Sequence, residues 1–145
     1  MKVDASIVIE KPASEVWRLL RDFIGLTVWS NAVTGARITN KKAADQLGAI
    51  RELEIEGGSV FVETLVAMSD EQRTLTYNIV DGPIPVTDYL ATMQVFSVTE
   101  NDQSFVRWSA EFSTPDAHVE AMRDVVGEQI CAGGLRALKA HMESD

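Results

Sequence analysis

The residues best placed to do chemistry are a glutamate and an arginine in two neighbouring apolar segments. Strand alternation in the run VFVETL puts Glu63 on the same face as Phe61 and Leu65. A carboxylate among core side chains is costly unless it meets a partner or water, and Arg51 on the preceding segment offers that partner. We therefore expect a wet cavity inside the fold, with Arg51 and Glu63 on its wall.

Aromatic side chains fall on the same predicted inner face. Alternation places Tyr77, Tyr89 and Trp108 among apolar neighbours, where any single ring is well explained as core. Two tyrosines together with an arginine and a glutamate favour a pocket, since ligand pockets carry a few convergent polar groups. Trp29 is expected either at the pocket mouth or as a packing anchor. The candidate ligand-binding residues are Arg51, Glu63, Tyr77, Tyr89, Trp108, Trp29 and Phe61.

The Arg51–Glu63 pair also has a purely structural interpretation. A buried ion pair is weak evidence for stability, because desolvation can cancel the attraction. If the pair is dry, removal of either partner should cost roughly 3–5 kcal/mol. A much smaller loss, accompanied by weaker ligand binding, would favour contact with a ligand.

The elements that must position these residues follow from periodicity. A strand over residues 3–9 precedes a helix that begins near Pro12 and a short helix over 26–29. The remainder of the chain after the strands is predicted as one long helix, from an N-cap at Asp116 to about His141. Between these helices six strands with short polar turns indicate an antiparallel meander, near residues 33–40, 48–56, 60–68, 73–81, 87–97 and 104–113.

The hairpin after Arg51 admits two registers. A two-residue turn at Gly57–Gly58 would set Glu63 opposite Glu52 and so gather acidic groups. A three-residue loop sets Glu63 opposite Leu53 and leaves Arg51 diagonal to it. Glycine is common at the left-handed position of such a loop, so we predict the longer one.

Three glycines interrupt the predicted last helix, at positions 127, 133 and 134. Each costs about 1 kcal/mol relative to alanine, so each needs a reason. Close packing against the sheet is the favoured reason, and room for the helix to shift is the alternative.

Composition excludes several classes of function. The 145 residues fit one domain, and a net charge of −9 disfavours nucleic acid and anionic membranes as partners. The one cysteine, Cys131, excludes a thiolate zinc cluster, and His118 and His141 have no metal-ligand spacing, so we expect no metal and no cofactor. The charged N-terminal run is no secretory signal, and no apolar run reaches the roughly 20 residues of a membrane span, so a cytoplasmic protein, monomer or homodimer, is expected.

The segments PASEVWRLLRDFIGLTVWS and GAIRELEIEGGSVFVETLVAMSDEQRTLTYNIVDGPIPVTDYLATMQV, followed by QSFVRWSAEF and GLRALKAHME, carry a family resemblance. They resemble the START-like (SRPBCC) superfamily, in particular the bacterial polyketide cyclase/dehydrase and lipid-transport family, over nearly the whole chain. This resemblance implies an α+β helix-grip fold, in which a curved antiparallel sheet of seven strands wraps around a long C-terminal helix, with two short helices after the first strand. It also implies one START-like ligand-binding domain over residues 1–145.

The central segment is more distantly similar to plant abscisic-acid receptors and to birch-pollen-allergen-like proteins. In the receptors a strand glutamate and a tyrosine line the hormone pocket, and the resemblance carries these roles to Glu63 and Tyr89. The sequence differs in loop 82–86, which reads GPIPV in place of the receptor gate. A related cavity is implied, and hormone signalling is not.

Two functions for a small molecule fit these features. The first is binding or transport of a hydrophobic, partly polar molecule such as a lipid, polyketide or aromatic compound. The second is a cyclase/dehydratase-type enzyme with Glu63 as general base and Arg51 or a tyrosine stabilising an enolate. An arginine beside Glu63 weakens it as a base, which favours binding. A protein-interaction regulator is a third possibility.

Overall fold

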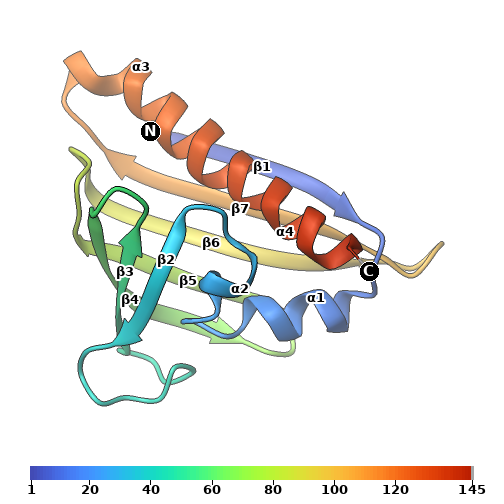
Figure 1. The fold of residues 1–145 in the computed structure, drawn as a ribbon. Helices are drawn as coiled ribbons and strands as arrows, with labels where there is room; N and C mark the ends of the chain where they lie inside the picture. The colour runs from blue at the N-terminus through green and yellow to red at the C-terminus, as the bar shows by residue number, and fades with distance from the viewer. Residues whose placement is uncertain (145) are drawn as a thin grey trace.

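One curved antiparallel sheet wraps around the C-terminal helix in the computed structural model, which describes residues 1–144 (Figure 1). The strand order is β1-β7-β6-β5-β4-β3-β2, so consecutive hairpins build the sheet and the first strand pairs with the last. This is the predicted α+β helix-grip architecture. The strands are β1 (Lys2–Ile9), β2 (Val33–Ile38), β3 (Ile50–Ile55), β4 (Val60–Ser69), β5 (Thr74–Asp81), β6 (Thr87–Val98) and β7 (Gln103–Ser113).

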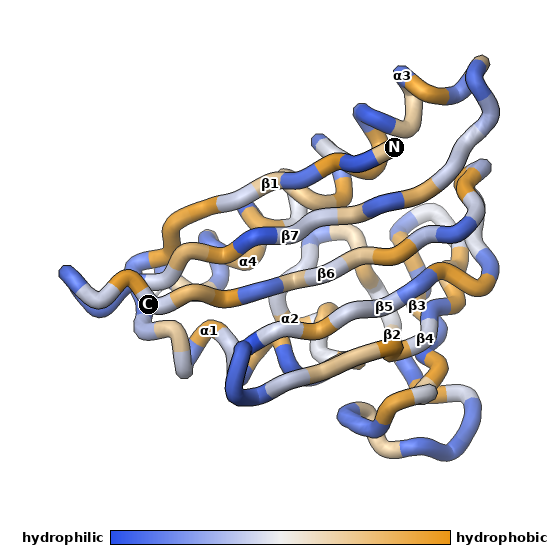
Figure 2. Tube along the Cα trace, turned by 180° about the vertical axis from the view of Figure 1, so that it is seen from behind, coloured by the Kyte–Doolittle hydropathy of each residue, from blue (hydrophilic) through white to orange (hydrophobic). Residues whose placement is uncertain are grey.

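Alternation along the strands decides which side chains enter the core. In β7, Val106, Trp108, Ala110 and Phe112 are buried while the residues between them are more exposed. Figure 2 shows the resulting bands of hydrophilic and hydrophobic residues along β1 and β7. The inner face of the sheet is therefore apolar, as the sequence pattern predicts.

Two helices follow β1 and close one end of the sheet. Helix α1 (Ala13–Leu20) begins after Pro12, whose extended backbone precedes the first turn, and it buries an i, i+3, i+4, i+7 stripe. The short helix α2 (Leu26–Trp29) buries Leu26 and Trp29. Both helices were predicted at these positions.

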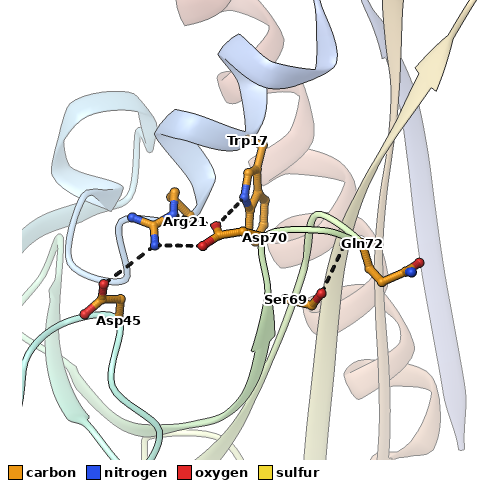
Figure 3. Close-up of polar contacts among 6 residues, drawn as sticks. All are labelled: Trp17, Arg21, Asp45, Ser69, Asp70 and Gln72. Carbon is orange, nitrogen blue, oxygen red and sulfur yellow. Dashed lines mark hydrogen bonds and ion pairs between the residues drawn. The ribbon is translucent and has the colours of Figure 1, made fainter.

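A cluster of polar side chains fixes α1 to the sheet (Figure 3). Asp70, in the turn between β4 and β5, accepts hydrogen bonds from Trp17 Nε1 and Arg21 Nε, each 2.8 Å long. Arg21 also lies 3.6 Å from Asp45 in the loop before β3. The hydrogen bonds from Arg21 and then Trp17 lower the pKa of the Asp70 carboxyl below its ordinary value. The cluster thus holds helix, turn and loop together.

The C-terminal helix differs from the prediction in its start and its winding. It begins with the 3-10 turn η1 (Asp116–His118) and the α-helical turn α3 (Val119–Met122), continues as the π-helical segment η2 (Arg123–Ala132), and ends as α4 (Gly133–Glu143). Asp116 lies inside the first turn, and Pro115 occupies the N-cap position with no side-chain capping bond. The predicted Asp116 N-cap is therefore wrong, because proline's extended backbone already marks the start of the helix.

Close packing explains at least one of the helix glycines. A Cβ added at Gly134 would lie 2.4 Å from Cζ3 of Trp108, whereas the nearest atoms to one at Gly127 and Gly133 lie 3.4 Å away. The helix can cross the sheet above Trp108 only because position 134 has no side chain.

Candidate functional site

The β3–β4 hairpin brings Arg51 directly opposite Glu63. The predicted diagonal arrangement is therefore wrong. The loop has three residues, as expected, but they are Glu56–Gly58 and not residues 57–59, and a backbone hydrogen bond from Ile55 N to Ser59 O (2.8 Å) closes it. Gly57 and Gly58 both have a positive φ, so the loop needs both glycines in the left-handed region. Because the loop begins one residue earlier than predicted, the residue opposite Glu63 changes by two positions, from Leu53 to Arg51.

The Arg51–Glu63 pair is buried and short. Arg51 Nε donates to Glu63 Oε1 at 2.8 Å, and Arg51 Nη2 lies 2.7 Å from the same oxygen. The two residues are only 3% and 5% exposed. Both contacts involve one carboxylate oxygen, so the second oxygen, Oε2, is not occupied by the arginine.

Arg51 is also fixed from the side of α1 and α2. Its Nη1 donates to the backbone carbonyl of Phe23 at 2.7 Å. Its guanidinium carbon lies 3.9 Å from the ring centre of Phe23 and 4.8 Å from that of Tyr77. A guanidinium held by a carboxylate, a carbonyl and two aromatic rings is well compensated for its burial.

Burial dominates the ionisation of the neighbouring groups. It raises the pKa of Glu63, while the charge of Arg51 and its hydrogen bond oppose that rise. Burial raises the pKa of Tyr77 and of Tyr89 well above the ordinary tyrosine value, so both phenols are neutral at pH 7.

A line of aromatic side chains crosses the inner face beside the ion pair. Trp108 Nε1 donates to the Tyr77 hydroxyl at 3.1 Å, and the Trp108 ring lies edge-on to Trp29 with centres 6.3 Å apart. Trp29 Nε1 is the one fully buried side-chain polar atom in residues 1–144 without a hydrogen-bond partner. Leaving such a donor unpaired costs about 1–3 kcal/mol.

These side chains line a pocket of about 500 Å³ between the sheet and the C-terminal helix. That volume lies in the range of small-molecule sites. Apolar residues dominate the wall, and among residues 1–144 the charged residues that line it are Arg51 and Glu63. The sheet contributes Leu53, Ile55 and Ile79 to the wall, and the helix contributes Ile130 and Ala137.

The exposed residues of the lining mark the pocket's mouth. They are Asn31 and Ala32 between α2 and β2, Ser59 in the β3–β4 hairpin, Pro83 in the β5–β6 loop and Gln129 on η2. Loop 82–86 thus reaches the rim through Pro83.

All seven residues singled out in the sequence line this one pocket: Trp29, Arg51, Phe61, Glu63, Tyr77, Tyr89 and Trp108. Trp29 is only 4% exposed, so it belongs to the inner wall while its neighbours Asn31 and Ala32 form the rim. Sequence reasoning missed Phe23, whose backbone carbonyl and ring both contact Arg51. A contact made by a backbone carbonyl cannot be recognised from the residue type, so no signal in the sequence could have found this one.

Other chemical groups stand apart from the pocket. Among residues 1–144, no group of three His, Cys, Asp or Glu side chains is placed to hold a metal ion. His118 and His141 are exposed, and Cys131 is fully buried. In the same part of the chain, the helices are all too short or too polar to cross a bilayer.

Fold and pocket together define a START-like helix-grip protein. The chain belongs to the family described as polyketide cyclase/dehydrase and lipid transport, whose model matches residues 1–143. The match spans the pocket-forming strands and the helix that covers them.

Solved structures of similar proteins share the fold over nearly their whole length. The XoxI protein of Bacillus cereus is 30% identical, with a TM-score of 0.85 over 95% of this chain and 92% of the other. An uncharacterized protein of Bacillus thuringiensis is 30% identical, with a TM-score of 0.89 over 99% of this chain and 100% of the other. A protein of Nitrosospira multiformis is 27% identical, with a TM-score of 0.84 over 99% and 97%.

Proposed function

We propose that this protein binds a small, mostly hydrophobic molecule with a polar end in the pocket between sheet and helix. One observation carries the proposal. A buried Arg–Glu pair and two tyrosines converge on the wall of an otherwise apolar pocket of about 500 Å³. Apolar walls supply affinity, and a few fixed polar groups orient the ligand.

The family description, which names lipid transport, supports this proposal. It also names polyketide cyclases and dehydrases, so an enzyme with Glu63 as general base is the second candidate. The raised pKa of Glu63 favours that candidate. The two short contacts from Arg51 disfavour it, because they stabilise the carboxylate and reduce its basicity.

Native mass spectrometry of the purified protein tests the proposal, followed by a thermal-shift screen of lipids, polyketides and aromatic compounds. A binding protein should retain a co-purified small molecule or gain stability with at least one ligand class, because a ligand that binds only the folded state raises the melting temperature. If no small molecule co-purifies with the protein and no ligand class shifts the melting temperature, small-molecule binding is wrong.

Turnover distinguishes the enzyme from the carrier. A carrier shows saturable binding without consumption of the ligand. An enzyme consumes its substrate, and the Glu63→Gln variant should lose that activity while circular dichroism shows that it remains folded.

A further inference from the structure

Two polar atoms on the pocket wall have unused hydrogen-bonding capacity. Within residues 1–144, Glu63 Oε2 and the Tyr89 hydroxyl make no hydrogen bond to another residue. In the same range, Trp29 Nε1 is the one side-chain polar atom that both lacks a hydrogen-bond partner and is inaccessible to solvent, so Oε2 and the hydroxyl oxygen are accessible. Glu63 and Tyr89 are 5% and 3% exposed, and both line the pocket. The space that Oε2 and the hydroxyl reach is therefore the pocket itself.

The charges on the wall cancel. Arg51 and Glu63 are the charged residues of the lining, and the three nitrogens of the guanidinium are already directed at Glu63 Oε1 and the Phe23 carbonyl. A ligand anion would meet the free carboxylate oxygen of Glu63 with no uncommitted cation beside it. Burying a charge without a partner is strongly unfavourable, so the pocket disfavours anions.

The tyrosines supply protons for hydrogen bonds. The Tyr77 oxygen accepts from Trp108 Nε1, so its own proton remains available, and the Tyr89 hydroxyl is unpaired. The wall thus offers hydroxyl donors and one carboxylate acceptor. A hydroxyl group is a simple uncharged group that both donates one hydrogen bond and accepts others.

We propose that the ligand is an uncharged, mostly apolar alcohol or phenol whose hydroxyl donates to Glu63 Oε2 and accepts from a tyrosine hydroxyl. The inference rests on the proposed function and narrows its ligand class. It separates hydroxyl-bearing ligands from fatty acids and other carboxylates, which share the apolar body but carry a negative charge.

A ligand series with one ring system tests this proposal. Binding of 2-naphthol, 2-methylnaphthalene and 2-naphthoate is measured at pH 7 by titration with fluorescence or calorimetric detection. We expect 2-naphthol to bind tightest, by about 10-fold or more over 2-methylnaphthalene, because a hydrogen bond to a charged acceptor is gained. We expect 2-naphthoate to bind weakest.

Two variants assign the preference to the named side chains. Tyr89→Phe should weaken 2-naphthol by roughly 3- to 10-fold, the effect of one neutral hydrogen bond, and leave 2-methylnaphthalene unchanged as the internal control. Glu63→Gln leaves the positive charge of Arg51 unbalanced, so the variant should bind 2-naphthoate at least about 10-fold more tightly than the original protein does. If Glu63→Gln does not fold, the Tyr89→Phe comparison still decides.

The outcomes separate the two proposals. If 2-naphthoate or 2-methylnaphthalene binds as tightly as 2-naphthol, the hydroxyl preference is wrong and the pocket still binds small molecules. If none of the three compounds binds, the proposed ligand class is overturned, and the thermal-shift screen of lipids, polyketides and aromatic compounds then decides the proposed function.

Discussion

Removing the carboxylate of Glu63 should destabilise the protein strongly. Glu63→Gln keeps the shape of the side chain but removes the charge that Arg51 meets at 2.7 and 2.8 Å. The amide oxygen of the variant can still accept a hydrogen bond from Arg51, and the Phe23 carbonyl at 2.7 Å and the two aromatic rings remain, but no negative charge balances the guanidinium. Breaking a buried pair costs about 3–5 kcal/mol, and we expect about 3 kcal/mol, because the pocket can admit water beside the uncompensated charge.

An exposed pair of equal length provides the matched control. Arg107 Nη2 lies 2.7 Å from Asp4 Oδ2, but these side chains are 52% and 56% exposed. Asp4→Asn should therefore cost less than about 1 kcal/mol. The double variant Arg51→Met/Glu63→Leu removes both charges and should be close to neutral or stabilising, since no unpaired charge remains.

Urea unfolding followed by tryptophan fluorescence gives the three free energies of unfolding by linear extrapolation. If Glu63→Gln costs no more than Asp4→Asn, the pair is solvated in the folded protein, and the account of a buried, compensated pair is refuted.

Further predictions concern the helix, the α1 cluster and the cysteine. Gly134→Ala should lose about 1–3 kcal/mol in urea unfolding, because its Cβ would meet Trp108 at 2.4 Å, while Gly133→Ala, with its nearest atom at 3.4 Å, should be neutral or stabilising. The pKa of Asp70 is lowered in the folded state, so its contribution is present above about pH 4 and lost as the pH falls through the folded pKa. Asp70→Asn should flatten the dependence of the melting temperature on pH below about pH 4, and an unchanged pH profile would contradict the role of the cluster. Burial raises the pKa of the Cys131 thiol to about 12, so a thiol reagent should label it only at the rate of unfolding; fast labelling in native buffer would show that it is accessible.

Much of the fold and the pocket wall could be predicted because strand alternation fixes which face a residue occupies. Glu63, Tyr77 and Tyr89 were placed on the inner face in this way, and all three are buried there. The pairing of Arg51 with Glu63 could not be fixed, because a three-residue loop can begin at residue 56 or 57 and the choice depends on backbone geometry.

The C-terminal helix shows a second limit of the sequence pattern. An apolar stripe at α-helical spacing predicts a helix, but it does not predict the π winding of η2 (Arg123–Ala132), in which the buried residues Val126 and Cys131 lie five positions apart. The contact between Gly134 and Trp108 likewise joins residues far apart in sequence, and only the packed fold reveals it.

Filling the pocket with a side chain tests the central claim most directly. Ile79 lines the pocket, whereas the next residue, Val80, is 60% exposed on the other face of β5. Isothermal titration of the original protein with 2-naphthol should show saturable binding at one site. We expect Val80→Trp to keep that binding and Ile79→Trp to lose it. Equal binding by both variants would contradict the assignment of this pocket as the ligand site.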